Sequence, residues 1–309
     1  MIRNSLIILV LILVSSANYA QQDSQFTQYM YNTININPAY AGSRDMLSIF
    51  AMHRTQWVGL DGAPVTNVAS ISSPVGKNVG LGVSIMNDKI GPSDENNIAV
   101  DFSYTISPSD NYKLSFGIKA SANLLNIDFT KLNQYNSGDY IFETNIDNKF
   151  TPNIGVGIFY YSDKTYFGFS APNLLETTHF DKYNNIGSNS RIAKEKIHYY
   201  MMAGHVFDLS SNIKFKPSVL SKIVTGAPWQ LDISGNVLFN EKFSLGLAYR
   251  LSAAASAMVG FQVSDSWFIG YAYDMATTDL AEYSYGTHEI FLRFELFNKI
   301  GKITSPRFF

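Results

Sequence analysis

The chain has 309 residues, of which 46% are hydrophobic and only 16% are charged. A net charge of −2 provides no basic field, which argues against nucleic acid as a partner, and the absence of cysteine excludes disulfides. After the first fifteen positions no apolar run reaches the roughly 18 residues of a membrane-spanning helix, so the apolar surface must be buried in another way.

The first 20 residues predict a cleaved export signal. Arg3 supplies a short positive region, Leu6–Val14 an apolar core, and Ser15–Ala20 small residues that place cleavage after Ala20. Because no cysteine follows, the signal is not that of a lipoprotein. We therefore expect residues 1–20 to be removed on export, with the mature chain in the outer membrane of a bacterium that has two membranes.

The next segment, residues 21–46, does not have the pattern of a barrel strand. Phe26, Tyr29 and Met30 would share one helical face, and Asn35–Gly42 carries the Pro and Gly of a turn-rich loop. An exported tail and an ordered plug or collar both fit this pattern. We favour a plug, because amide and aromatic side chains can satisfy a polar wall and fill volume without burying charge.

From residue 47 to 309 the pattern predicts about 14 strands. The expected strands are 47–57, 67–73, 79–88, 96–106, 112–125, 150–161, 165–171, 197–208, 213–222, 229–239, 243–251, 255–264, 266–275 and 287–297. An even count places both chain ends on the same side of the membrane, the periplasmic side.

The connections alternate between tight polar turns and longer loops. Tight turns are expected at 74–78, 107–111, 162–164, 209–212, 240–242 and 264–266, and longer loops at 58–66, 89–95, 126–149, 173–196, 223–228, 252–254 and 276–286. Outer-membrane barrels have short periplasmic turns and longer external loops, so we expect 126–149 and 173–196 at the cell surface.

The stretch Phe243–Asp274 shows the clearest period-two alternation. Apolar and aromatic residues, such as Leu247, Phe261 and Ile269, alternate with Gly, Ser, Ala and isolated polar residues. A soluble sandwich also alternates, but its second face would carry the Lys and Glu of a water-exposed surface. The pattern therefore favours an all-β, transmembrane antiparallel β-barrel with its apolar face toward lipid.

Charged residues of both signs fall on the inner face, which indicates internal ion pairs rather than a selectivity ring of one sign. The expected inward residues include Arg54, Asp101, Lys113, Lys119, Lys214, Lys216, Asp232, Arg250, Asp274, Glu289 and Arg293.

No sequence pattern predicts catalysis, a cofactor or a metal site. The chain has no nucleotide-binding loop and no zinc spacing, and its histidines form no derivable Ser–His register. We expect no enzyme activity and interpret the histidines as structural or interfacial.

Three motifs are too specific for a generic pore. They are Gln25–Tyr29 with Asn32 and Asn37–Gly42, then Arg54–Thr66 (RTQWVGLDGAPVT), then Tyr285–Phe294 (YGTHEIFLRF). Together they resemble the PorP/SprF family of outer-membrane proteins of the type IX secretion and gliding systems of Bacteroidetes. The resemblance extends along the mature chain through Lys89–Pro92, Ala171–Leu174, Gly226–Trp229 and Ser305–Phe309.

The resemblance implies a non-enzymatic barrel of the secretion machinery. Family members are associated with secreted surface adhesins that carry a C-terminal sorting domain, and with periplasmic OmpA-like proteins that bind peptidoglycan or meet the motor ring. A passive channel or a hydrophobic-substrate transporter is the alternative. Cargo and periplasmic partner are not determined by the sequence.

The motifs supply candidate partner-binding residues. These are Gln25, Phe26, Gln28, Tyr29, Asn32, Asn37, Pro38, Gly42, Arg54, Gln56, Trp57, Gly59, Gly62, Pro64, His288 and Glu289. For the second motif a structural interpretation stays open, with Trp57 as an interface anchor and its Gly and Pro residues as turn formers.

Overall fold

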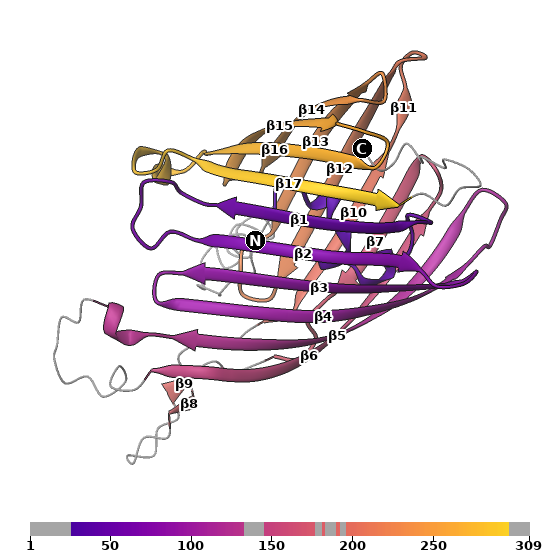
Figure 1. The fold of residues 1–309 in the computed structure, drawn as a ribbon. Coiled ribbons are helices and arrows are strands. Elements are labelled where there is room, and N and C mark those ends of the chain that lie inside the picture. Colours follow the sequence, from indigo (N-terminus) through magenta and orange to yellow (C-terminus); the bar gives the residue numbers. More distant parts are fainter. Residues whose placement is uncertain (1–25, 133–144, 177–180, 183–189, 192–195, 297–309) are drawn as a thin grey trace, which may run out of the picture.

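The computed structural model describes residues 26–132, 145–176, 181–182, 190–191 and 196–296. Its main feature is one antiparallel sheet that closes on itself into a barrel (Figure 1). The strands follow the order β10-β7-β6-β5-β4-β3-β2-β1-β17-β16-β15-β14-β13-β12, and β10 also pairs with β12, so the sheet is a complete ring that closes between the first and last wall strands of the chain, β1 and β17. β11 pairs with β12 and continues the line of β10, so the wall has 14 strand positions, as the sequence predicts.

The wall strands have bounds close to those expected. They are β1 (Leu47–Thr55), β2 (Val65–Pro74), β3 (Val79–Ile90), β4 (Ser93–Ile106), β5 (Lys113–Ile127), β6 (Ile146–Tyr161), β7 (Thr165–Ala171), β10 (His198–His205), β11 (Phe207–Asp208), β12 (Ile213–Val224), β13 (Gln230–Phe239), β14 (Phe243–Arg250), β15 (Ala254–Gln262), β16 (Trp267–Ala276) and β17 (Thr287–Leu296). A separate two-residue pairing, β8 (Asp181–Lys182) with β9 (Ser190–Arg191), lies between β7 and β10 in the chain.

Two details of the strand prediction were wrong. The expected strand 197–208 is divided at Val206 into β10 and β11, although the amide of Val206 still donates to the carbonyl of Lys164 and β11 keeps the register of β10 against β12. The expected loop 89–95 is a two-residue turn at 91–92, because β3 and β4 stay paired as far as Ile90 and Ser93. The connection 251–253, at three residues, is also tight.

The two ends of the barrel differ in their connections. One end carries the turns 75–78, 107–112, 162–164, 209–212, 240–242 and 263–266, together with the start of β1 and the end of β17; we call it the short-turn end. The other, the long-loop end, carries 56–64, 128–145, 172–197, 225–229 and 277–286, besides the two tight turns. The loops include the short helices η4 (Phe129–Lys131) and η6 (Asp279–Glu282).

The wall has the two faces that the alternation predicts. Leu247, Phe261 and Ile269 point outward, and Leu247 is 71% exposed in the isolated chain. Inward positions carry the charged side chains, which pair across strands: Lys119 Nζ lies 3.5 Å from Asp101 Oδ1, and Arg250 Nη2 lies 2.9 Å from Asp232 Oδ2. The expected internal ion pairs are therefore confirmed.

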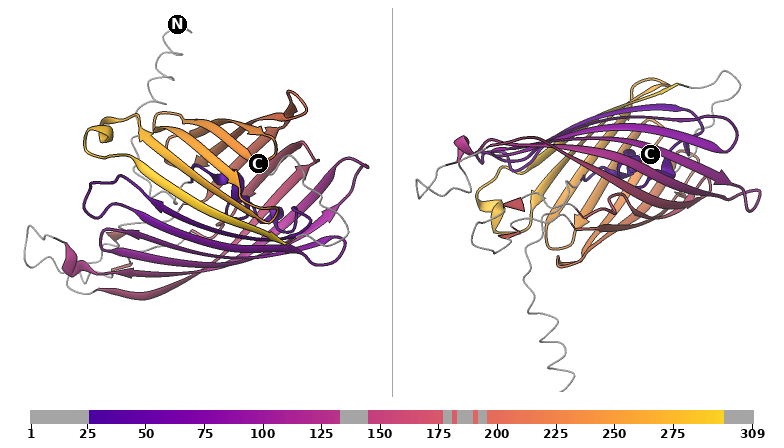
Figure 2. Two further views of the ribbon diagram at one scale, coloured as in Figure 1. Left: turned by 45° about the horizontal axis from the view of Figure 1, so that its top comes forward. Right: turned by 90° about the horizontal axis from the view of Figure 1, so that it is seen from below.

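Residues 26–45, here the inner segment, lie inside the barrel (Figure 2). They form three single-turn 3₁₀ helices, η1 (Tyr29–Tyr31), η2 (Thr33–Asn35) and η3 (Pro38–Tyr40), in place of the expected single helical face. Thr27 and Gln28 are as deeply buried as Phe26 and Tyr29, because the wall surrounds the segment on all sides. Gln21–Gln25 lie outside the described residues.

In the part of the chain that the structure describes, no helix combines the length and the apolar character needed to cross a bilayer.

The lipid-facing register can be tested with two leucines. Leu247→Arg is expected to lower the free energy of unfolding by about 2–4 kcal/mol, because it places a cation near the middle of the lipid face. The matched control is Leu209→Arg, in a short turn where the side chain is 63% exposed. It is expected to stay within about 0.5 kcal/mol of the parent. Urea unfolding in lipid vesicles measures both, and equal losses would contradict the register.

Candidate functional site

A buried ion pair joins the second and third motifs. Arg54 comes from β1 and Glu289 from the neighbouring strand β17, and the two residues are paired directly in the sheet. Arg54 Nη1 lies 2.7 Å from Glu289 Oε2, and Arg54 Nη2 lies 2.9 Å from Asp274 Oδ2 of β16. The three side chains are 5% exposed or less, so one guanidinium bridges two buried carboxylates.

The first motif completes this cluster from inside the lumen. The amide of Gln28 donates to Glu289 Oε1 at 2.9 Å and the amide of Thr27 donates to Glu289 Oε2 at 3.2 Å. The hydroxyl of Thr27 donates to Asp274 Oδ2 at 2.6 Å. We call Thr27, Gln28, Arg54, Asp274 and Glu289 the motif junction, because each of the three motifs contributes at least one residue to it.

The contacts of the motif junction indicate a structural role. Glu289 accepts hydrogen bonds at both carboxylate oxygens, whereas Asp274 is contacted at Oδ2 alone, by Thr27 and Arg54, and its Oδ1 has no partner among the described residues. Glu289 is fully buried and its oxygens are directed at the protein's own donors. The arrangement can fix the inner segment to β1, β16 and β17.

The second half of the first motif is held against β5 and β6. Asn37 is fully buried; its Nδ2 donates to the carbonyl of Ile158 at 3.0 Å, and its Oδ1 caps η3 by accepting from the amide of Ala39. The backbone here approaches the wall so closely that only glycine fits opposite. A Cβ at Gly117 would overlap the backbone of Pro38 and Ala39, and one at Gly157 would overlap the side chain of Asn37.

Polar groups of the wall bind the rest of the inner segment strand by strand. Wall side chains donate to the segment at five places: Ser70 to Asn32 Oδ1 at 3.0 Å, Ser103 to the carbonyl of Ala41 at 2.7 Å, Ser170 to that of Ile36 at 2.9 Å, and Lys119 to those of Ile34 and Asn35 at 3.3 and 3.1 Å. In return, the amide of Gly42 donates to Ser72 Oγ at 2.9 Å. A single-turn helix leaves most backbone groups without internal partners, and the wall supplies them.

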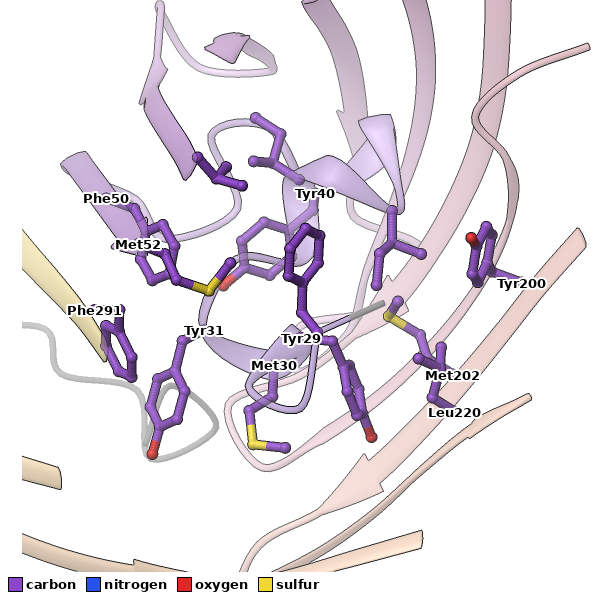
Figure 3. Close-up of a cluster of buried hydrophobic side chains, with 14 of the residues drawn as sticks. Tyr29, Met30, Tyr31, Tyr40, Phe50, Met52, Tyr200, Met202, Leu220 and Phe291 are labelled. Carbon is purple, nitrogen blue, oxygen red and sulfur yellow. The ribbon is translucent and has the colours of Figure 1, made fainter. Parts of the chain in front are cut away.

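Between these polar contacts lies an apolar core (Figure 3). Tyr31 packs on Phe291 and Phe268, with ring centroids 4.6 and 5.5 Å apart, and Tyr40 meets the edge of Phe159 at 5.4 Å. The sequence prediction of a lumen lined mostly by small residues was therefore incomplete. Large inward side chains of the wall, among them Phe50, Met52, Phe159, Tyr200, Met202, Leu220 and Phe291, meet the inner segment.

The loop of the second motif is ordered by the start of the third. The amide of Trp57 donates to Thr287 Oγ1 at 3.1 Å, and Val58 exchanges backbone hydrogen bonds with Gly286 and Tyr285 at 2.9 and 2.7 Å. Gly59 and Gly62 have positive φ angles of 100° and 73°, which side chains rarely adopt. Motif residues therefore continue from the buried junction to the surface of the long-loop end.

Above the motif junction a pocket of about 330 Å³, here the vestibule, opens at the long-loop end. Its lining combines charged and polar side chains with apolar ones: Arg54, Gln56, Trp57, Pro64, Asp88, Ile90, Gln230, Arg250, Ser252, Ala253, Ala254, Asp274, Ala276, Thr278, Leu280, Gly286 and Thr287. Gln56, Trp57 and Pro64 of the second motif thus line the same space as Arg54.

The remaining candidates are distributed around these sites. Phe26, Tyr29, Asn32, Asn37 and Pro38 are buried in the lumen, and Gly42, with φ of 70°, turns the chain at the short-turn end. His288 is separate from the junction: its side chain is on the outer face, where Nδ1 lies 2.6 Å from the hydroxyl of Tyr271. Gln25 lies outside the described residues.

Two residues of the motif junction were not among the candidates. Asp274 was expected on the inner face from the alternation of its strand, but not as a site residue. Thr27 lies within the first motif, but a threonine in an irregular segment is recognisable as a site residue only once its partner is known. Among the described residues, no cluster of three or more His, Cys, Asp or Glu side chains could hold a metal ion.

Comparisons with known proteins agree with this picture. The family model described as "Type IX secretion system membrane protein PorP/SprF" matches residues 18–294. A search of curated proteins finds no match. Among solved structures, the chain is similar to the CymD monoaromatic hydrocarbon channel, at 12% identity and a TM-score of 0.53, over 88% of this chain and 94% of that one.

The Pseudomonas putida toluene transporter TodX has a TM-score of 0.49 at 8% identity, over 91% of this chain and 95% of that one. At these identities the similarity to CymD supports the barrel fold alone.

The structural role of the motif junction predicts that removing its cation alone destabilises the barrel more than removing the cation together with both carboxylate charges. Arg54→Met is expected to lower the free energy of unfolding by about 3–5 kcal/mol, because it leaves two buried carboxylates without a counter-charge. Adding Asp274→Asn and Glu289→Gln to that variant is expected to recover part of the loss, since the neutral amides need no cation. Denaturant unfolding of the refolded barrel measures both.

The control is Lys113→Met, which removes the exposed pair with Asp45 and is expected to cost less than about 1 kcal/mol. A loss for Arg54→Met no larger than that of Lys113→Met would contradict the structural role of the junction.

Proposed function

Because the chain belongs to the PorP/SprF family of type IX secretion membrane proteins, we propose that it is a non-enzymatic outer-membrane anchor of that machinery. In this proposal the long-loop end faces the cell exterior and retains a secreted adhesin through its C-terminal sorting domain. The short-turn end faces the periplasm and contacts an OmpA-like peptidoglycan-binding protein or the motor ring.

The observation that supports an anchor most directly is the state of the lumen. Residues of all three motifs meet in the lumen, and the protein's own inner segment fills this space instead of leaving it open. A barrel that used its lumen for transport would keep its polar wall available to a solute. Here Asp274, Glu289 and Lys119 bind the inner segment instead.

The long-loop end offers a surface suited to a protein partner. Tyr283 and Tyr285 are 68% and 79% exposed, although the backbone of Tyr285 is bonded to Val58. Trp57 is also exposed, and the same two loops carry the exposed carboxylates Asp61, Asp279 and Glu282. Exposed aromatic side chains on a rigid backbone are common anchors of protein interfaces.

The alternative function, a passive channel or hydrophobic-substrate transporter, has one observation in its favour. A cavity lined by Tyr29, Met30, Thr33, Tyr40, Phe159, Tyr166 and Met202 lies beside the inner segment, and its lining is mostly aromatic and apolar. Its volume is about 10 Å³, however. A benzene ring needs a cavity of about 150 Å³, so this space holds at most one water molecule.

Adhesin retention tests the anchor. The double variant Tyr283→Ala, Tyr285→Ala is expected to retain at least about tenfold less adhesin, because loss of one aromatic anchor commonly costs more than 1.4 kcal/mol. The matched control is Phe207→Ala, Leu209→Ala, whose side chains are 49% and 63% exposed at the short-turn end. Surface immunodetection and co-purification in mild detergent measure retention. Unchanged retention by the tyrosine variant, at normal barrel abundance, would count against docking at this surface.

Conductance in planar bilayers separates the anchor from the channel. The intact protein is expected to be nearly silent, whereas deletion of Gln22–Tyr40 with the export signal kept is expected to give large, stable openings. The tyrosine double variant serves as a control, since it alters the long-loop end but leaves the inner segment in place. Large openings by the intact protein would support the passive channel instead.

A further inference from the structure

The direction of the inner segment through the barrel is fixed by its contacts at both ends. Thr27 and Gln28 bond to Glu289, the third residue of β17, which begins at the long-loop end. Asp45 pairs with Lys113, the first residue of β5, which begins at the short-turn end. Between Thr27 and Asp45 the chain therefore passes from the long-loop half of the lumen to the short-turn end, where β1 starts.

This direction is the opposite of what the sequence suggests. A segment that precedes the first strand is expected to lie at the mouth where that strand begins. Here only its last residues do so, and its first described residues lie under the vestibule.

Among the described residues, the inner segment obstructs the way from Phe26 back to the short-turn end. The residues from Tyr29 to Ala41 are almost all buried, and they bond to strands from β2 to β7 around half of the wall. On the opposite side Tyr31 packs on Phe268 and Phe291. The cavity between Tyr29, Tyr40 and Phe159, at about 10 Å³, is too small to admit a second strand of chain.

The vestibule, by contrast, begins at the motif junction and is open. Arg54 and Asp274 line it and also contact the side chain of Thr27, so its floor is where the described chain starts. Glu289 is the third residue of β17, which puts the long-loop rim about 10 Å away along the strand. Five extended residues, 21–25, reach about 17 Å, which is enough to pass the rim.

We propose that the chain preceding Phe26 leaves the lumen through the vestibule, so that the mature amino terminus lies at the long-loop end. The protein is then threaded through its own barrel, with its amino terminus and the end of β17 at opposite ends. The occupant of the vestibule is the chain's own residues 21–25 rather than a small solute. In this proposal residues 21–25 lie next to the exposed loop of the second motif and form part of the surface at the long-loop end. This inference does not depend on the identity of any partner.

The absence of cysteine in the sequence makes single-cysteine labelling a direct test. Gln22→Cys reports on the amino-terminal residues, Asp279→Cys marks the long-loop end, and Ser210→Cys marks the short-turn end. Each full-length variant is treated with a membrane-impermeant maleimide on intact cells and again after permeabilisation. Gln22→Cys is expected to label under the same conditions as Asp279→Cys, and the comparison holds whichever end faces outward. If Gln22→Cys instead labels under the same conditions as Ser210→Cys, the proposal is overturned.

A cross-linking arm covers the case in which the vestibule shields the new thiol. Ser24→Cys combined with Ala253→Cys, in the vestibule lining, is expected to cross-link with a short thiol-specific reagent. Ser24→Cys combined with Ser210→Cys is expected not to cross-link and is the matched control. An unlabelled Gln22→Cys together with no vestibule cross-link would overturn the proposal, because residues 21–25 would then lie elsewhere.

Discussion

A closed wall of 14 strands encloses more space than its own side chains can fill, and this constraint governs the rest of the structure. Closure is required because an open strand edge cannot be satisfied in lipid. The protein fills the resulting lumen with its own chain, in three single helical turns whose backbone groups need partners. The inner wall therefore supplies both donors, such as Ser103 and Ser170, and apolar rings, such as Phe291.

In the motif junction, buried charges of the wall hold the inner segment in the lumen. A buried carboxylate is costly unless donors surround it, and Glu289 is surrounded by a guanidinium and two backbone amides. Those two amides belong to the inner segment, so the charge on the wall and the unpaired backbone of the segment satisfy each other. The junction thus links the amino-terminal residues to three strands, β1, β16 and β17, at the place where the two ends of the wall meet.

The same arrangement connects the interior to the long-loop end. Arg54 belongs to the junction, and three residues later Trp57 is exposed and bonded to Thr287. A rigid path of short contacts therefore runs from the lumen core to the loops that we propose as the docking surface for cargo. A barrel whose lumen is filled by its own chain, with an ordered loop at the long-loop end, is better suited to the proposed role of holding a partner than to passing a solute.

The sequence by itself determined the wall. Side chains of a strand alternate between faces with a period of two, so the outward positions of Leu247 and Ile269 and the inward positions of Asp101 and Lys119 could be predicted without any long-range information. The alternation of tight turns with longer loops supported the strand assignment independently, and the motifs predicted the family, which the family model confirms.

Only the tertiary structure decided how the motifs meet. Arg54 and Glu289 are 235 residues apart in the sequence, and Thr27 and Asp274 are 247 apart. Their contacts exist because β1 pairs with β17 at ring closure, in a register that no local pattern encodes. The path of the inner segment likewise depends on a lumen that forms only once the ring is closed. Local periodicity fixes which face a residue occupies, whereas its partner across the lumen is fixed by closure.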